Sequence, residues 1–191
     1  DLLDVMELSE GSWLSFLSND DQYSREKLQG DLENLESYYL DRGYLQFSIE
    51  SSQVSISRDR SSIFIAYIIS EGPQYTINEV KIVGDMPINE EFTNPIINSQ
   101  KDITYSQAQI TQIEEIFTSL LGNEGYAFAS VAGQPNIDEE MLEVDLSFVI
   151  DPGKRTYARK ILFEGNEITQ DDVLRREMRQ FEGAWASDDK I

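Results

Sequence analysis

Apolar residues recur at helical spacing in two parts of the chain, and each part ends in a Gly-Tyr pair. The apolar positions of the first part are Leu28, Leu32, Leu35 and Tyr39. Those of the second part are Ile110, Ile113, Phe117 and Leu120. Steps of three and four residues place side chains on one face of a helix. The pattern therefore predicts two amphipathic helices, and Gly43 and Gly125 stand where a helix ends in a left-handed residue.

A strand-like alternation begins directly after each Gly-Tyr pair. Its apolar residues are Leu45, Phe47 and Ile49 in the first copy, and more weakly Ala127, Ala129 and Val131 in the second. A second strand follows in each copy: 63–69 is apolar on both faces, and 142–150 alternates cleanly. The residues expected to point inward from the latter are Leu142, Val144, Leu146, Phe148 and Ile150. The parity of the apolar positions changes around Ser51-Ser52, which predicts a β-bulge there.

These elements form an internal repeat. The Gly-Tyr pair at Gly125 lies 82 residues after the pair at Gly43. A Tyr-Ser pair before each helix has the same offset, and its serines, Ser24 and Ser106, are expected to cap the two helices. Because the anchors match without a gap, one module is predicted to occur more than once.

A third element completes the module. A short strand ending in Gly-Asp or Gly-Asn recurs at 77–85 and 158–166, each time before an acid-rich helix start. The unit is strand, helix, helix, strand, strand, so we predict an α+β fold of tandem modules. Residues 1–73 would lack the first strand, 74–154 would be complete, and 155–191 would supply only a strand and a helix. The alternative is two unrelated α+β pieces that share a turn.

Composition narrows the class of protein. The formal charge is −21, which disfavours nucleic acid and anionic membrane surfaces as partners. Cysteine and histidine are absent, which excludes disulfides, thiolate metal sites and the commonest general base. No apolar run approaches the length of a membrane-spanning helix. The first residues are acidic and apolar-periodic, unlike a signal peptide, and suggest the interior of a longer protein.

An enzyme is the rival class, because adjacent acidic pairs are frequent. Paired carboxylates act as acid and base where burial separates their pKa values. With 36 acidic residues such pairs are expected by chance, and no phosphate loop, EF-hand or nucleophile elbow appears. We therefore expect no catalytic residue, no cofactor and no metal centre, although a weak surface calcium site stays open. The residues alone predict tandem interaction modules without catalysis.

Several stretches carry a resemblance to a known family. The most specific are "KLQGDLENLESYYLDRGY", "ILFEGN" and "TQDDVLRREMRQFEGAW", whereas "MPINEEFTNPIINSQKD" is divergent. They resemble the third, fourth and fifth POTRA modules of the outer-membrane β-barrel assembly family. The resemblance covers essentially the whole chain and implies a three-stranded sheet with two helices on one face. It also implies a location at the periplasmic face of the outer membrane, with unfolded outer-membrane proteins and accessory lipoproteins as partners.

The resemblance implies a binding edge in the first module. In the family the last strand is central and the preceding one lies at an edge, which makes 44–56 the edge strand. Its free backbone groups would pair with extended client chains, and a BamB-like lipoprotein would dock there. The side chains that we expect to take part are Phe47, Ile49, Glu50, Val54 and Ile56. The alternative is an ordinary edge strand blunted by Glu50 and Arg58.

The last predicted helix is a second candidate surface. The resemblance implies docking of a BamD-like lipoprotein on a face that includes Arg175, Arg176, Arg179 and Glu182. Arg175 and Glu182 are seven residues apart, so in a continuous helix they would share one face. The alternative is a charged face that only meets solvent.

Three further readings stay open. The chain could be a purely structural spacer, or it could belong to a related outer-membrane translocation protein. The predicted strand at 157–164 has no sheet of its own, whereas the first module lacks a strand. Head-to-tail self-association, in which this strand fills the gap in a neighbouring molecule, is therefore a further hypothesis.

Overall fold

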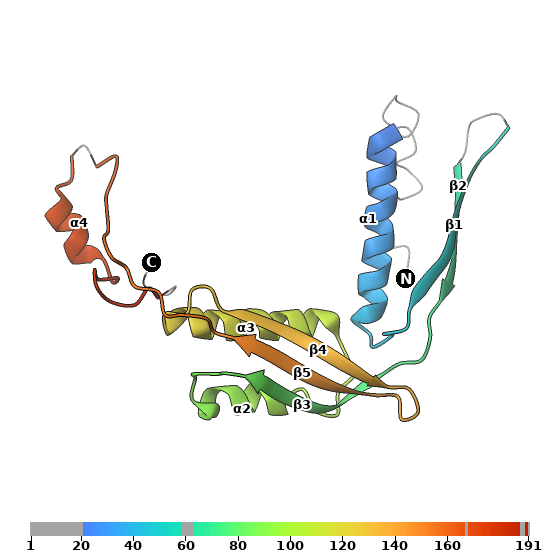
Figure 1. Cartoon of the computed structure of the whole chain (residues 1–191). Coiled ribbons are helices and arrows are strands. Elements are labelled where there is room, and N and C mark those ends of the chain that lie inside the picture. The colour runs from blue at the N-terminus through green and yellow to red at the C-terminus, as the bar shows by residue number, and fades with distance from the viewer. Residues whose placement is uncertain (1–20, 59–62, 167, 188–189, 191) are drawn as a thin grey trace. The chain divides into compact units, whose positions relative to one another are not determined.

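A computed structural model describes residues 21–58, 63–166, 168–187 and 190 of the chain (Figure 1). The chain divides into two compact units. Unit 1 comprises 1–76, 102–108 and 138–144, and unit 2 comprises 77–101, 109–137 and 145–191. The predicted α+β fold is confirmed, with helices, a two-stranded sheet and a three-stranded sheet among the described residues.

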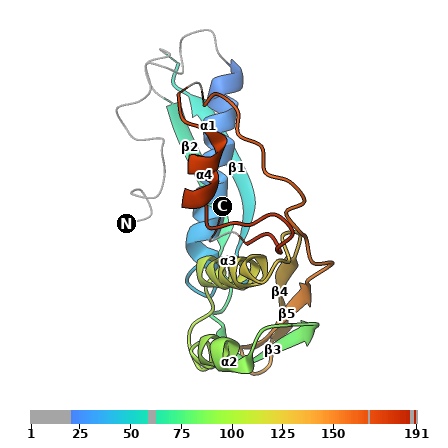
Figure 2. The ribbon, with the colours of Figure 1, turned by 90° about the vertical axis from the view of Figure 1, so that its left-hand side faces the viewer.

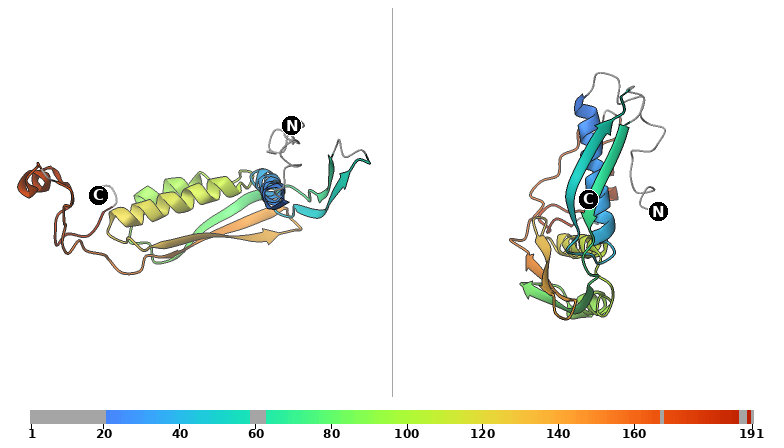
Figure 3. Two further views of the ribbon diagram at one scale, coloured as in Figure 1. Left: turned by 90° about the horizontal axis from the view of Figure 1, so that it is seen from above. Right: turned by 90° about the vertical axis from the view of Figure 1, so that its right-hand side faces the viewer.

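Unit 1 contains helix α1 (Asp21–Leu40) and strands β1 (Ser48–Ile56) and β2 (Ile63–Ser70). The two strands pair antiparallel, and α1 lies along one face of the pair (Figures 1 and 3). The predicted bulge is confirmed, because the register shifts between Ile49 and Ser51. A small aromatic core holds helix and strands together: Leu35, Tyr39 and Phe47 are buried, with Tyr38, Tyr44, Ile49 and Ile69 packed around them.

One complete module lies mostly in unit 2. Its elements are β3 (Thr76–Gly84), α2 (Glu90–Asn98), α3 (Gln107–Asn123), β4 (Ser130–Asp138) and β5 (Glu143–Asp151). The strand order is β3-β5-β4, so the last strand is central, as predicted. Both helices cover the same face of the sheet (Figures 2 and 3). The buried side chains of β5 are Val144, Leu146, Phe148 and Ile150.

Leu142 does not belong to this inward set. It lies in the β4–β5 turn, is 39% exposed and has a φ of 56°. The alternation continued into the turn by coincidence, because a left-handed residue there reverses the chain before β5 begins at Glu143.

The predicted helix ends are confirmed in both copies. The N–H of Tyr44 donates to the Tyr39 carbonyl at 3.1 Å, and the N–H of Gly43 donates to Leu40 at 3.3 Å. This pair of bonds is the Schellman arrangement, which needs a left-handed residue, and Gly43 has a φ of 87°. Gly125 repeats the arrangement with a φ of 93°.

Four boundaries differ from the sequence prediction. β1 begins at Ser48 rather than at Tyr44, because the chain first makes a turn in which Phe47 N–H bonds to the Tyr44 carbonyl at 3.1 Å. The same turn delays β4 to Ser130. Ser24 lies inside α1 and so is not its cap, whereas α3 begins directly after Ser106. The fourth boundary is the end of the last helix, α4 (Asp171–Glu177), which stops before Arg179 and Glu182.

Candidate functional site

The first candidate site is the outer edge of β1. On one side β1 pairs with β2, and no described backbone group outside that pair bonds to it. The strand is nine residues long and contains no proline. Its polar side chains are largely exposed, as is Val54 at 45%. An extended chain could therefore pair with this edge through backbone groups alone.

The five predicted edge residues do not share one environment. Phe47 precedes the strand and is buried, with its ring stacked on Tyr39 at 4.2 Å between centroids. Ile49 packs against the same core, and Ile56 is the last residue of β1, opposite Ile63. Among the four whose side chains the structure describes, Glu50, at the register shift, and Val54 are the exposed ones. Side-chain recognition by Phe47 is therefore excluded in this conformation, and the backbone edge is what remains.

The corresponding strand of the second module, β4, is closed to pairing at two places. The N–H of Gly133 donates to the Glu114 carboxylate of α3 at 2.5 Å, and Pro135 has no N–H to offer. The two residues are two apart, so their nitrogen atoms point to the same side of the strand. Because the Gly133 N–H meets a carboxylate of α3, that side is the outer edge of β4. Glu114 was not among the predicted site residues, since helical periodicity does not show which acid reaches a strand.

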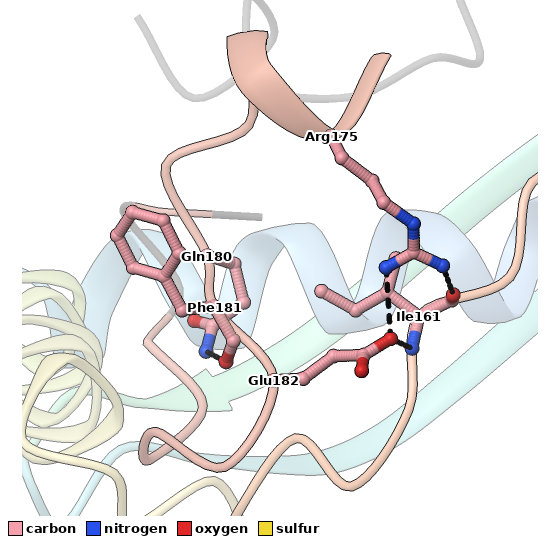
Figure 4. A network of polar contacts seen from close by, with 5 residues as sticks. All are labelled: Ile161, Arg175, Gln180, Phe181 and Glu182. Carbon is pink, nitrogen blue, oxygen red and sulfur yellow. Dashed lines mark hydrogen bonds and ion pairs between the residues drawn. The ribbon is translucent and has the colours of Figure 1, made fainter. Parts of the chain in front are cut away.

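The second candidate site is a closed polar network after the last helix (Figure 4). The Arg175 guanidinium donates to the Glu182 carboxylate at 2.9 Å and to the Ile161 carbonyl at 2.8 Å. The same carboxylate oxygen accepts the N–H of Ile161 at 2.9 Å. The hydrogen bond from Ile161, followed by the bond from Arg175, lowers the pKa of Glu182 below its ordinary value. The carboxylate is therefore bound within its own chain as an anion.

The spacing predicts that Arg175 and Glu182 share one helix face, but the structure differs from this prediction. Helix α4 spans only Asp171–Glu177, and Met178 is extended. The chain then turns back, which brings Glu182 to Arg175. The turn is held by Gln180, which is buried and whose amide donates to the carbonyls of Phe181 and Trp185 at 3.1 Å each. Apolar spacing could not predict these side-chain bonds to the backbone.

The remaining charged residues of this site face solvent. Arg176, in the last turn of α4, and Arg179 are exposed, and Phe181 beside them is 67% exposed. A partner could therefore reach two cations and an aromatic ring without breaking the Arg175–Glu182 pair.

The predicted strand at 157–164 is absent. Only Tyr157 forms a β-bridge, to Trp185, and the segment is otherwise irregular. Two of its residues bond within the chain: Ala158 bonds to Ala184 and Gly183, and Ile161 bonds to Glu182 and Arg175. Head-to-tail exchange would require these bonds to break and the segment to become extended, and it stays a prediction.

Within the described ranges, no group of three or more acidic side chains could hold a metal ion. No helix there is long and apolar enough to cross a membrane.

The geometry thus defines α+β modules in which helices cover one face of a small sheet, with an open edge at β1 and a charged turn after α4. The chain belongs to the POTRA family: residues 1–72 and 75–153 match the family described as "Surface antigen variable number repeat". Among curated proteins, it is 36% identical over 175 residues to the outer membrane protein assembly factor BamA of Buchnera aphidicola. It is 28% identical over 184 residues to BamA of Neisseria meningitidis. These alignments cover 91% and 96% of this chain but only 28% and 23% of the relatives.

Solved structures agree with the sequence relatives. The crystal structure of Haemophilus influenzae BamA POTRA3-5 superposes with a TM-score of 0.74 at 28% identity. The match covers 97% of this chain and 73% of that one. A BamA structure from Haemophilus ducreyi that lacks POTRA domains 1-3 is 40% identical over 59% of this chain, with a TM-score of 0.53. The chain is therefore similar to the third to fifth POTRA modules of BamA.

Proposed function

We propose that the chain is a periplasmic scaffold and client-binding region of the machinery that assembles outer-membrane proteins. The similarity to BamA proteins, which are named outer membrane protein assembly factors, supports a role in this assembly process. The contrast between the open edge of β1 and the closed edge of β4 supports the mode of binding. On this proposal, residues 1–73, 74–154 and 155–191 act as three successive modules, the first of which receives clients.

The mechanism is strand addition to β1. An unfolded outer-membrane protein in extended form would pair its N–H and C=O groups with the outer edge, largely regardless of side chain. A backbone hydrogen bond contributes only about 0.5–1.5 kcal/mol net in water. A few such bonds give weak, reversible binding, which suits a client that must leave to complete its own barrel. A BamB-like lipoprotein would use the same edge, with Glu50 and Val54 as its accessible side chains.

A BamD-like lipoprotein would dock on the turn after α4. Arg176, Arg179 and Phe181 form the exposed part of this surface, and the Arg175–Glu182–Ile161 network holds the turn in shape. Glu182 is therefore proposed to act through the conformation of the turn. An exposed ion pair alone contributes roughly 0.2–1 kcal/mol, whereas breaking a pair in a desolvated interface costs roughly 2–5 kcal/mol.

Two neighbouring proline substitutions test the β1 edge. Ser52 and Gln53 lie opposite Tyr67 and Ala66, and successive residues of a strand point their N–H groups to opposite sides. Proline at one position removes a β1–β2 bond, and at the other it removes an outward donor. The variant that keeps the thermal midpoint of the parent identifies the outward residue. We expect that variant to lose binding to a soluble nine-residue peptide of alternating β-barrel sequence, measured by fluorescence anisotropy.

Alanine at the same position is the matched control, because it changes the side chain and keeps the N–H. Undiminished peptide binding by the folded proline variant would contradict strand addition. A chain that binds neither peptide nor lipoprotein in any form would instead favour a structural spacer.

Two substitutions of Glu182 test the turn. In Glu182→Gln an oxygen still accepts the Ile161 N–H but the charge is lost, whereas Glu182→Lys loses both. We expect Glu182→Lys to weaken binding of a BamD-like lipoprotein strongly, with faster amide exchange at Ile161, and Glu182→Gln to do so only partly. Normal affinity of Glu182→Lys at both low and physiological salt would refute this surface. Equal loss in both variants, with the Ile161 amide still protected in Glu182→Gln, would show that the partner contacts the carboxylate directly.

A further inference from the structure

Two junctions between successive modules are built by the same backbone bonds. In unit 1 the Gly43 carbonyl accepts the N–H of Tyr75 at 2.9 Å, and the Tyr75 carbonyl accepts the N–H of Tyr105 at 3.1 Å. In unit 2 the Gly125 carbonyl accepts Thr156 at 2.8 Å, and the Thr156 carbonyl accepts Ala186 at 2.9 Å. Thr156 lies one repeat after Tyr75, and Ala186 lies one repeat after Tyr105. The junction is therefore a repeated structural feature rather than a chance contact.

Close contacts repeat in the same way. A Cβ on Gly43 would lie 2.8 Å from the Thr104 side chain, and one on Gly125 would lie 2.7 Å from Trp185. A Cβ on Gly72 would lie 3.0 Å from Gln46, and one on Gly153 would lie 3.9 Å from the Phe128 carbonyl. Gln46 and Phe128 thus hold equivalent places, each three residues after the glycine of its junction.

The unit 1 junction has one more component, the tip of the β4–β5 hairpin. The amide of Gln46 donates to the Glu139 carboxylate at 2.7 Å, and the N–H of Thr76 donates to the Leu142 carbonyl at 3.2 Å. The tip therefore reaches back to the position that follows the Gly-Tyr turn of the preceding module. In unit 2 that position is Phe128, which is 82% exposed, more than almost any other large apolar residue in the described part of the chain.

We propose that Phe128 is the docking position for the β-hairpin tip of the module that begins at Thr156, in the longer protein in which that module is complete. The position one repeat after Glu139 lies beyond residue 191, so this hairpin tip is not part of the present chain. The occupant would present an apolar side chain where Glu139 stands in the first junction, because a phenyl ring replaces the amide of Gln46. The proposal concerns contacts between modules and does not depend on the proposed client binding.

Cysteine cross-linking tests the proposal, since this chain contains no cysteine of its own. In the longer protein, made free of other cysteines, Phe128→Cys is combined with one cysteine at the tip of the third hairpin and treated with a short bis-maleimide. We expect an intramolecular link that forms at least about tenfold faster than the link from Phe92→Cys to the same tip, because contact raises the effective concentration of the two thiols. Phe92 is the matched control, since it is also an exposed phenylalanine, at 63%, of the same module.

Gln46→Cys with Glu139→Cys in the 191-residue chain is the positive control, because their side chains are in contact. If that pair links while the Phe128 pair links no faster than the Phe92 pair, the proposal is wrong. It is also wrong if the Phe128 link forms only between separate molecules, or if an added unfolded outer-membrane protein, rather than the hairpin tip, protects the thiol at position 128.

Discussion

Replacing Gly43 by alanine perturbs both the helix end and the junction of unit 1. The new Cβ would lie 2.9 Å from the Tyr75 carbonyl oxygen and 2.8 Å from the Thr104 side chain. A left-handed alanine costs roughly 1–2 kcal/mol, and displacing Tyr75 loses a backbone bond of about 0.5–1.5 kcal/mol. Reduced freedom of the unfolded chain offsets about 0.4–1 kcal/mol. We therefore expect a net loss of about 0.5–3 kcal/mol in the free energy of unfolding of unit 1.

The assay is urea unfolding combined with residue-resolved amide exchange, because global unfolding alone would not locate the damage. Gly43→Ala should speed exchange of the Tyr75 amide and leave the Thr156 amide unchanged, and Gly125→Ala should do the reverse. Gly30→Ala is the matched control: no atom lies within 4 Å of its new Cβ. It should stabilise α1 by about 0.5–1 kcal/mol, since glycine inside a helix is destabilising. Unchanged stability and unchanged Tyr75 exchange in Gly43→Ala would refute the reasoning.

Two further substitutions test the packing and electrostatics of the modules. Gly84 has a φ of 105°, and a new Cβ would meet the Ile150 carbonyl of β5. Gly84→Ala should therefore lower the stability of unit 2 by about 1–2 kcal/mol in urea unfolding, because a left-handed alanine is strained. Burial, together with a 2.6 Å bond to Glu71, raises the pKa of Tyr39 from 10.0 to about 12. The neutral Tyr39 phenol therefore contributes its full share to the free energy of unfolding below pH 10. This contribution is lost as the pH rises toward about 12. Thermal midpoints of Tyr39→Phe should decline less steeply over that interval, and an identical decline would contradict the assignment.

The repeat itself was predictable because it rests on local chemistry. Apolar spacing determines the buried face of α3, and glycine is required wherever the chain turns left-handed after a helix. The bulge near Ser51 was visible as a change of parity, since an extra residue transfers the inward positions to the other set. In each case one residue pattern permits one local geometry.

The misplaced boundaries depended on partners distant in sequence. Residues 157–164 have the composition of a strand, but a strand needs a neighbour, and here the turn around Glu182 takes the backbone groups instead. Helix α4 ends at Glu177 because Gln180 anchors the following turn through its side chain. Phe47 fits the alternating pattern of a strand, but it lies in a turn and its ring packs in the aromatic core. No periodicity along the chain encodes these contacts.

The central claim is that clients add to the outer edge of β1. Its most direct test is residue-resolved amide exchange of the chain with and without a saturating nine-residue peptide of alternating β-barrel sequence. Every second amide of β1 is expected to become protected, while exchange in β4 stays unchanged because Glu114 and Pro135 close that edge. Protection of β4, or unchanged exchange along β1 with bound peptide, would contradict it.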